Sequence, residues 1–126
     1  MKTSAQSDIL PEAALAQAMD RLWLKFLPEI RERVSILEAA AAAVTAKKLS
    51  DSGCEAAHAA AHKLAGVLGT FNLTHGTDVA RELEVAYARE FAERAATGKR
   101  LAQLAAELRT MIESRKSGID SRKSSS

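Results

Sequence analysis

The chain has 126 residues, of which 47% are hydrophobic, and it carries a formal net charge of +2. This length suits one compact domain, and the hydrophobic content is well above that of disordered chains. The 6 glycines and 2 prolines are too few to punctuate an all-β sandwich. The small net charge does not indicate a nucleic-acid partner by itself, so none is expected.

The expected compartment follows from similar observations. No apolar run reaches the roughly 18 residues of a membrane span, and no secretory signal follows Met1. The single cysteine, Cys54, excludes an internal disulfide framework and a cysteine-rich zinc site. We therefore expect a cytoplasmic protein that does not bind membranes. We also expect it to be a monomer.

The two ends of the chain differ in composition from its middle. Residues 114–126 contain one apolar side chain and no periodicity, so they cannot bury enough surface to offset their ordering entropy. We predict a flexible N-terminal tail over residues 1–8, one helical bundle over residues 9–114 and a disordered C-terminal tail over residues 115–126.

The first part of the predicted bundle has helical periodicity. Asp8 is expected to cap the first helix, with Pro11 in its first turn, where proline is tolerated. The apolar face of this helix comprises Leu15, Ala18, Leu22 and Phe26. Pro28 is expected to end or kink it. The next apolar face comprises Ile30, Val34, Leu37, Ala41 and Val44.

Three further helices are predicted downstream. Ser52-Gly53-Cys54-Glu55 is a capping box, in which serine and glutamate satisfy each other's free amides. The apolar face that follows comprises Cys54, Ala57, Ala61, Leu64 and Leu68. After Asn72 the next face comprises Leu73, Ala80, Leu83 and Tyr87. After Thr97-Gly98 the last one comprises Leu101, Leu104, Ala105, Leu108, Met111 and Ile112. Long amphipathic helices with short connections predict an all-α fold, an antiparallel four-helix bundle with an additional short N-terminal helix.

The outer face of the third predicted helix carries an unusual set of residues. At about 100° per residue, His62 points about 130° away from the centre of the apolar face. Glu55, His58, Gly66 and Gly69 fall on or near the same outer side. Each mid-helix glycine costs up to about 1 kcal/mol relative to alanine. Either another helix packs closely against these glycines, or they mark the approaching end of the helix, or a partner approaches His62 there.

The segment from Ala61 to Leu73, A-H-K-L-A-G-V-L-G-T-F-N-L, resembles the signature of histidine-containing phosphotransfer (HPt) domains. That signature is close to H-x-L-K-G-x-x-x-x-ϕ-G-L, where ϕ is apolar. The matching positions are His62, Leu64, Gly66, Phe71 and Leu73, and the downstream Ala80 and Leu83-Glu84 also fit. The helix count and the chain length agree with the resemblance.

Two positions depart from the family pattern. Ala65 stands where the family usually has a lysine that faces the phosphate, and Lys63 is a candidate substitute. Asn72 replaces a glycine, and asparagine also suits a left-handed helix cap.

The resemblance implies a phosphorelay intermediate that is a phosphocarrier and not an enzyme. Nε2 of His62 would accept and donate the phosphoryl group, while Glu55 and His58 are candidates for tuning the proton on Nδ1. The supporting residues would be Lys63, Gly66, Glu55, His58 and Gly69. The partners would be receiver domains of response regulators and a hybrid sensor histidine kinase. The receiver would supply Mg²⁺, and the chain is expected to hold no cofactor of its own. The chain has no nucleotide-binding loop, so it should not phosphorylate itself from ATP.

Two other interpretations stay open. His58 and His62 at i, i+4 could chelate a metal together with Glu55 or His75, although the inner glutamate of a zincin helix is missing. Alternatively, the chain is a helical adaptor that binds its partner without phosphotransfer. Leu24 and Leu27 lie off the first apolar face, and they either contribute to docking or are buried.

Overall fold

The computed structural model describes the backbone of residues 2–124 and the side chains of residues 12–122. Within that range the chain forms five helices and no strand. These are α1 (Lys2–Thr45), α2 (Asp51–Thr70), α3 (Thr74–Ala88), α4 (Phe91–Ala96) and α5 (Gly98–Ser124). The predicted all-α bundle is confirmed, and the short α4 between α3 and α5 is an element that the sequence did not indicate.

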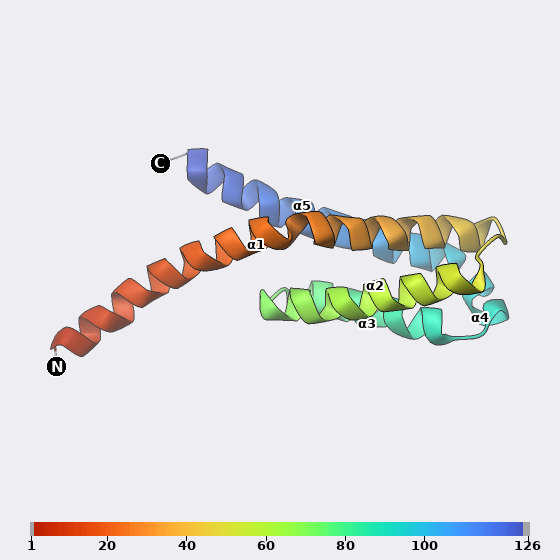
Figure 1. The fold of residues 1–126 in the computed structure, drawn as a ribbon, viewed down its shortest axis with the longest axis horizontal. Helices are drawn as coiled ribbons and strands as arrows, with labels where there is room; N and C mark the ends of the chain where they lie inside the picture. The colour runs from red at the N-terminus through yellow and green to blue at the C-terminus, as the bar shows by residue number, and fades with distance from the viewer. Residues whose placement is uncertain (1, 125–126) are drawn as a thin grey trace.

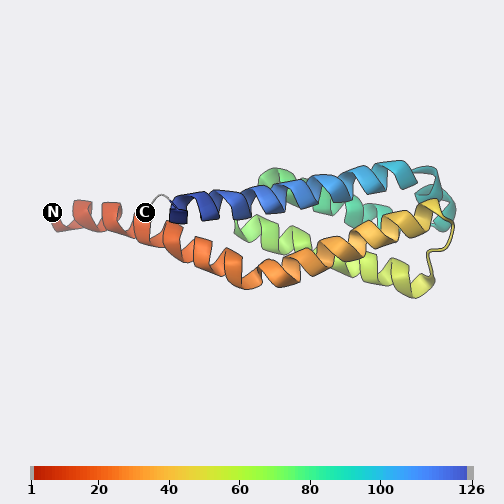
Figure 2. The ribbon, with the colours of Figure 1, turned by 90° about the horizontal axis from the view of Figure 1, so that it is seen from above.

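Four of the helices form the bundle. α2 packs against α1 and α3, and α5 packs against α3 and α1. α1 and α5 are longer than the other two and extend past them at the end where both chain termini lie (Figures 1 and 2). The largest side chains that are fully buried between the helices include Trp23, Ile30, Leu37, Leu64, Leu68, Leu83, Leu104, Leu108 and Ile112.

α1 is one continuous helix where the sequence predicted two. It changes direction in the part coloured orange in Figures 1 and 2, and Pro28 lies in this part of the sequence. The proline ring removes one backbone hydrogen bond and favours a kink. Burial of Leu27 and Ile30 on either side of Pro28 holds the helix together across it. The predicted N-terminal helix is therefore continuous with the first bundle helix, and the backbone of residues 2–8, predicted as a tail, begins it.

The buried face of α1 differs from the predicted one. Leu15, Leu22 and Phe26 are 61%, 40% and 37% exposed, whereas Trp23 and Leu27 are in the core. Apolar residues cover more than half of this helix, so periodicity alone allows two faces. Trp23 decides between them, because its ring is fully buried and packs edge-on against Phe71 with the centroids 5.1 Å apart. Burial of Leu27 also removes it from any docking surface.

α5 continues through the segment predicted to be a disordered tail. Its backbone is helical to Ser124, and Ile119 is 2% exposed. Asp20 of α1 accepts hydrogen bonds from Arg115 at 3.3 Å and from Arg122 at 2.8 Å. The guanidinium of Arg115 also lies over the ring of Trp23, 5.2 Å from its centroid. These contacts with α1 order a segment whose composition alone predicts disorder.

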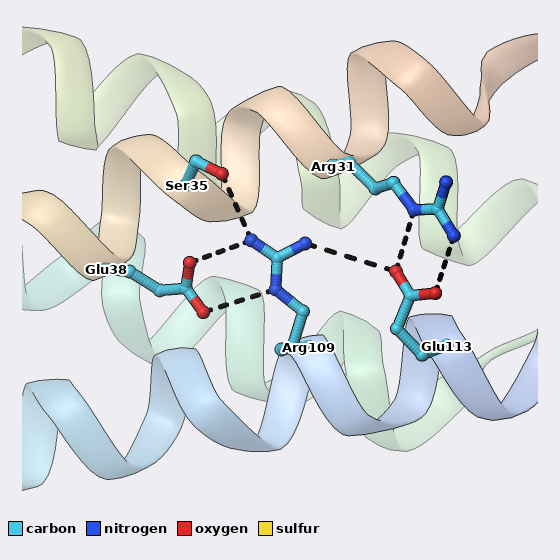
Figure 3. A network of polar contacts seen from close by, with 5 residues as sticks. All are labelled: Arg31, Ser35, Glu38, Arg109 and Glu113. Atoms are coloured by element: carbon cyan, nitrogen blue, oxygen red, sulfur yellow. Dashed lines mark hydrogen bonds and ion pairs between the residues drawn. The ribbon is translucent and has the colours of Figure 1, made fainter.

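A second polar network joins the middle of α1 to α5 (Figure 3). Arg31 donates two hydrogen bonds to the carboxylate of Glu113, at 2.7 and 2.6 Å, and this bonding lowers the pKa of Glu113. Arg109 donates to Glu38 at 2.7 Å and to Ser35 at 3.0 Å. The network lies on the α1–α5 side of the bundle, so it leaves the outer face of α2 uncovered.

Candidate functional site

The ends of α2 fix the position of its outer face. Ser50 caps its N-terminus: the side-chain oxygen accepts a hydrogen bond from the backbone N–H of Gly53 at 3.0 Å. The predicted capping residue, Ser52, is inside the helix, because the hydroxyl of Ser50 already reaches the third N–H. At the other end Asn72 has a φ of 58°, the left-handed conformation expected there.

His62 projects from the middle of α2 into solvent. Its side chain is 71% exposed, and its Nδ1 lies 2.8 Å from Oε2 of Glu84 on α3. An ionised carboxylate can only accept a hydrogen bond, so Nδ1 carries the proton. In the neutral imidazole Nε2 then holds the lone pair. The pair therefore presents an oriented nucleophile at the surface.

Glu84 takes the place that the sequence analysis gave to Glu55 and His58. His58 lies one turn and Glu55 two turns before His62, and both line a shallow depression next to Cys54 and Tyr87. The side chain of Glu84 is 22% exposed, so it is held more firmly than a free surface side chain. The sequence resemblance included Glu84 but gave it no role, because the register between α2 and α3 is not visible in one sequence.

The two glycines after His62 differ in their surroundings. A Cβ atom built on Gly66 would have no described atom within 4 Å outside its own helix turn, so no neighbouring helix requires glycine there. A Cβ on Gly69 would lie 3.7 Å from Oγ1 of Thr77 on α3, an ordinary contact. Gly66 therefore leaves open surface one turn beyond His62.

Lys63 and Ala65 lie on different faces of α2. Lys63 is exposed and forms no ion pair among the residues that the structure describes. Ala65 is 3% exposed. In the sequence Ala65 lies between His62, whose Nδ1 contacts Glu84 of α3, and Gly69, on which a Cβ would contact Thr77 of α3. Ala65 therefore belongs to the α3-facing side of α2. A lysine at this position would start inside the α2–α3 contact.

The structure offers no support for the metal interpretation. No group of three histidine, cysteine or acidic side chains is placed to hold a metal ion in the described part of the chain. His75 lies in the first turn of α3, with its Nε2 3.6 Å from Oε1 of Glu107 on α5.

The thiol of Cys54 is half-buried and donates a hydrogen bond to the carbonyl of Tyr87 at 3.1 Å. Burial raises the pKa of the Tyr87 hydroxyl to about 12.

Comparison with known proteins identifies the family. A family profile described as Hpt domain matches residues 21–118, well over half of the chain. No curated protein and no solved structure gives a significant match. None of the described helices is long and apolar enough to cross a membrane. Hpt domains are histidine phosphocarriers of two-component signalling, and they interact with receiver domains and kinases in phosphorelays. The match and the helical bundle show that this chain belongs to the Hpt domain family.

Proposed function

We infer that this Hpt domain relays a phosphoryl group on Nε2 of His62 between the receiver domain of a hybrid histidine kinase and the receiver domain of a response regulator. In the forward step the Nε2 lone pair attacks the phosphorus of a receiver aspartyl phosphate. The Nε2–P bond forms, the P–O bond to the aspartate breaks, and the aspartate leaves as a carboxylate. The reverse step passes the group to a second receiver.

The observation that carries this proposal is the pairing of His62 with Glu84. The Nδ1–H donates to a carboxylate 2.8 Å away, which fixes the ring and stabilises the positive charge that develops on the imidazole as Nε2 attacks. The 71% exposure of the side chain leaves Nε2 accessible to a second protein. These two properties are what a phosphocarrier requires of its histidine.

The remaining catalytic groups belong to the partner in this proposal. Phosphoryl transfer has a loose transition state, so positioning and charge neutralisation supply most of the catalysis. Glu84, the one side chain hydrogen-bonded to His62 among the described residues, is anionic and offers no neutralisation. The receiver would contribute Mg²⁺ and its acidic pocket, and this chain would contribute the oriented nucleophile.

Docking is supported by the groove between α1 and α2. Its lining is mostly small, with alanines from both helices and Gly53 at one end: Ile36, Ala39, Ala40, Ala43, Gly53 and Ala56. Small residues let a partner helix approach closely, and the exposed ring of Phe26 supplies a larger apolar contact toward the other end of α1. Gly66 adds open surface one turn beyond His62 on the same helix.

The test uses purified receiver domains labelled with radioactive phosphate. Label is expected to move to the wild-type chain and to His58→Gln, and not to His62→Gln. Because His62 is exposed, His62→Gln should keep the helix content and melting temperature of the wild type. Label on His62→Gln would contradict the assignment of the phosphorylated residue.

Ala65 favours one alternative, an adaptor that binds receivers without accepting phosphate. The position lacks a cation and is buried, so it cannot balance phosphate charge. In that case the wild type would bind a receiver but acquire no label, and the same assay reports both results when binding is measured in parallel.

A further inference from the structure

A phosphoryl group on His62 would enter a region that already carries a negative charge. Glu84 holds Nδ1 at 2.8 Å, and the phosphoryl group adds close to two negative charges at neutral pH. Ala65 supplies no cation from the α3 side of α2. A nearby positive charge would have to come from elsewhere in the bundle.

The orientation of the imidazole indicates the side on which to look. Nδ1 faces α3, because its partner Glu84 belongs to that helix. Nε2 is at the far edge of the ring, so a phosphoryl group bonded to it lies in solvent and away from α3. The other neighbour of α2 in the bundle is α1.

Lys63 is on the α1-facing side of α2. It follows Ala56 by seven residues, so the two share one face of the helix. Ala56 lines the groove between α1 and α2. The exposed side chain of Lys63 therefore belongs to the side of α2 away from Glu84.

Arg33 occupies the matching side of α1. It precedes Ala40 by seven residues and Ile36 by three, and both of these line the same groove. Its level along the bundle follows from the contact of Trp23 with Phe71, 5.1 Å between ring centroids. The antiparallel helices rise equally per residue, so the position ten residues beyond Trp23 faces the position ten residues before Phe71. Arg33 therefore lies at about the level of Ala61 and His62 along the bundle.

The structure gives neither cation an ion-pair partner within residues 12–122. Arg33 is half-buried and Lys63 is exposed, and neither makes an ion pair among the described residues, although Glu29 precedes Arg33 by one helical turn. Packed helices lie about 8–10 Å apart, a distance that an extended arginine side chain spans. Two like charges beside each other attract an anion placed between them.

We propose that Arg33 of α1 and Lys63 of α2 form the cationic side of the phosphoryl site and contact the phosphoryl oxygens on His62. The two residues supply the positive charge that Ala65 does not. This inference rests on the proposed phosphorylation of His62. Arg33 lies 29 residues before His62 in the sequence and on another helix, so no local motif includes it.

The test phosphorylates the whole chain with phosphoramidate, a small donor that needs no partner protein. The P–N bond of the donor breaks, ammonia leaves with the electron pair and takes a proton, and the Nε2–P bond forms. The rate of labelling and the hydrolysis lifetime are then measured for the wild type, Arg33→Gln, Lys63→Gln and Arg33→Lys. The equilibrium with a phosphorylated receiver is measured at low and high salt.

Arg81→Gln is the matched control, because it removes the same charge from an exposed position on α3, the helix on the Glu84 side. Arg33→Gln and Lys63→Gln should each shift the equilibrium away from phosphohistidine by about 1.5- to 5-fold, the range expected for an exposed ion pair. The shift should shrink at high salt. The equilibrium measured for Arg33→Lys should be close to that of the wild type, because the charge is kept. Unchanged melting temperatures would show that the variants fold.

The outcomes separate the two proposals. If His62 becomes labelled but Arg33→Gln behaves like the wild type or like Arg81→Gln, the cationic site is wrong and the phosphocarrier function stands. If neither donor labels His62 in the wild type, both proposals are overturned.

Discussion

Replacing Gly66 by alanine should stabilise the protein and impair its function. A Cβ at this position has no described atom within 4 Å, so it adds no steric strain. The gain is then the difference in helix propensity, about 0.8–1 kcal/mol for glycine to alanine in a helix interior. For a domain of this size that corresponds to a rise in melting temperature of about 4 °C. The same methyl group narrows the approach to His62, so phosphotransfer from a receiver should slow, and Gly66→Leu should slow it further.

Gly76→Ala is the matched control, because that glycine is buried in α3. Its Cβ would lie 3.1 Å from Cδ1 of Leu68 and 3.6 Å from Sδ of Met111. Leu68 is 1% exposed and has little room to move, so overpacking should lower the unfolding free energy by about 1 kcal/mol or more. Urea unfolding followed by circular dichroism measures both variants. A destabilised Gly66→Ala, or one that transfers phosphate as fast as the wild type, would refute the open-surface interpretation.

Three further predictions concern other contacts. Glu84→Ala should slow phosphotransfer by about tenfold or more, the effect of losing a charge-assisted hydrogen bond, while Glu55→Ala should not. Equal transfer rates of the two variants would show that the contact of Glu84 with Nδ1 of His62 is dispensable. The pKa of Glu113 is lowered by the hydrogen bond from Arg31, so stability from this pair is present above the usual value of 4.5 and is lost as the pH falls below it. Glu113→Gln should flatten that dependence in acid unfolding curves. Ala65→Lys should lower the unfolding free energy by about 1–3 kcal/mol, because the site is 3% exposed; a neutral result in urea unfolding would mean that the lysine reaches solvent along α3.

The geometry of α2 was predictable from its own residues. One helical wheel places His62 and Gly66 on the outer face, because the two leucines of this helix, Leu64 and Leu68, lie on the opposite face. The structure agrees: Leu64 and Leu68 are buried, and His62 is exposed. A local periodicity is enough where the face is unambiguous.

Contacts between helices were not predictable in the same way. The pairing of Glu84 with His62 depends on the register of α2 against α3, which no property of a single helix determines. The last turns of α5 are held in place by Asp20 of α1. Its partner Arg122 is 102 residues away in the sequence. The composition of that segment is polar, and its ion pairs with α1, the burial of Ile119 and the i,i+4 ion pair of Lys116 with Asp120 explain why it is helical.

The face of α1 shows a third limit. Leu22 and Trp23 are adjacent and point in different directions, and both belong to plausible apolar stripes. The choice is made by the partner surface, since Phe71 offers Trp23 an edge-to-face contact that Leu22 does not have. Proline was equally ambiguous, because Pro28 kinks a helix when the core holds both halves and ends it otherwise.

The most direct test of the central claim is to locate the phosphoryl group after incubation with a phosphorylated receiver. Mass spectrometry under neutral or alkaline conditions, which preserve a P–N bond, should find one acid-labile phosphate on the peptide that contains His62. The His62→Gln variant should carry none while keeping the melting temperature of the wild type. Phosphate on His58 or His75, or a wild-type chain that binds the receiver and stays unmodified, would contradict the assignment of His62 as the phosphocarrier residue.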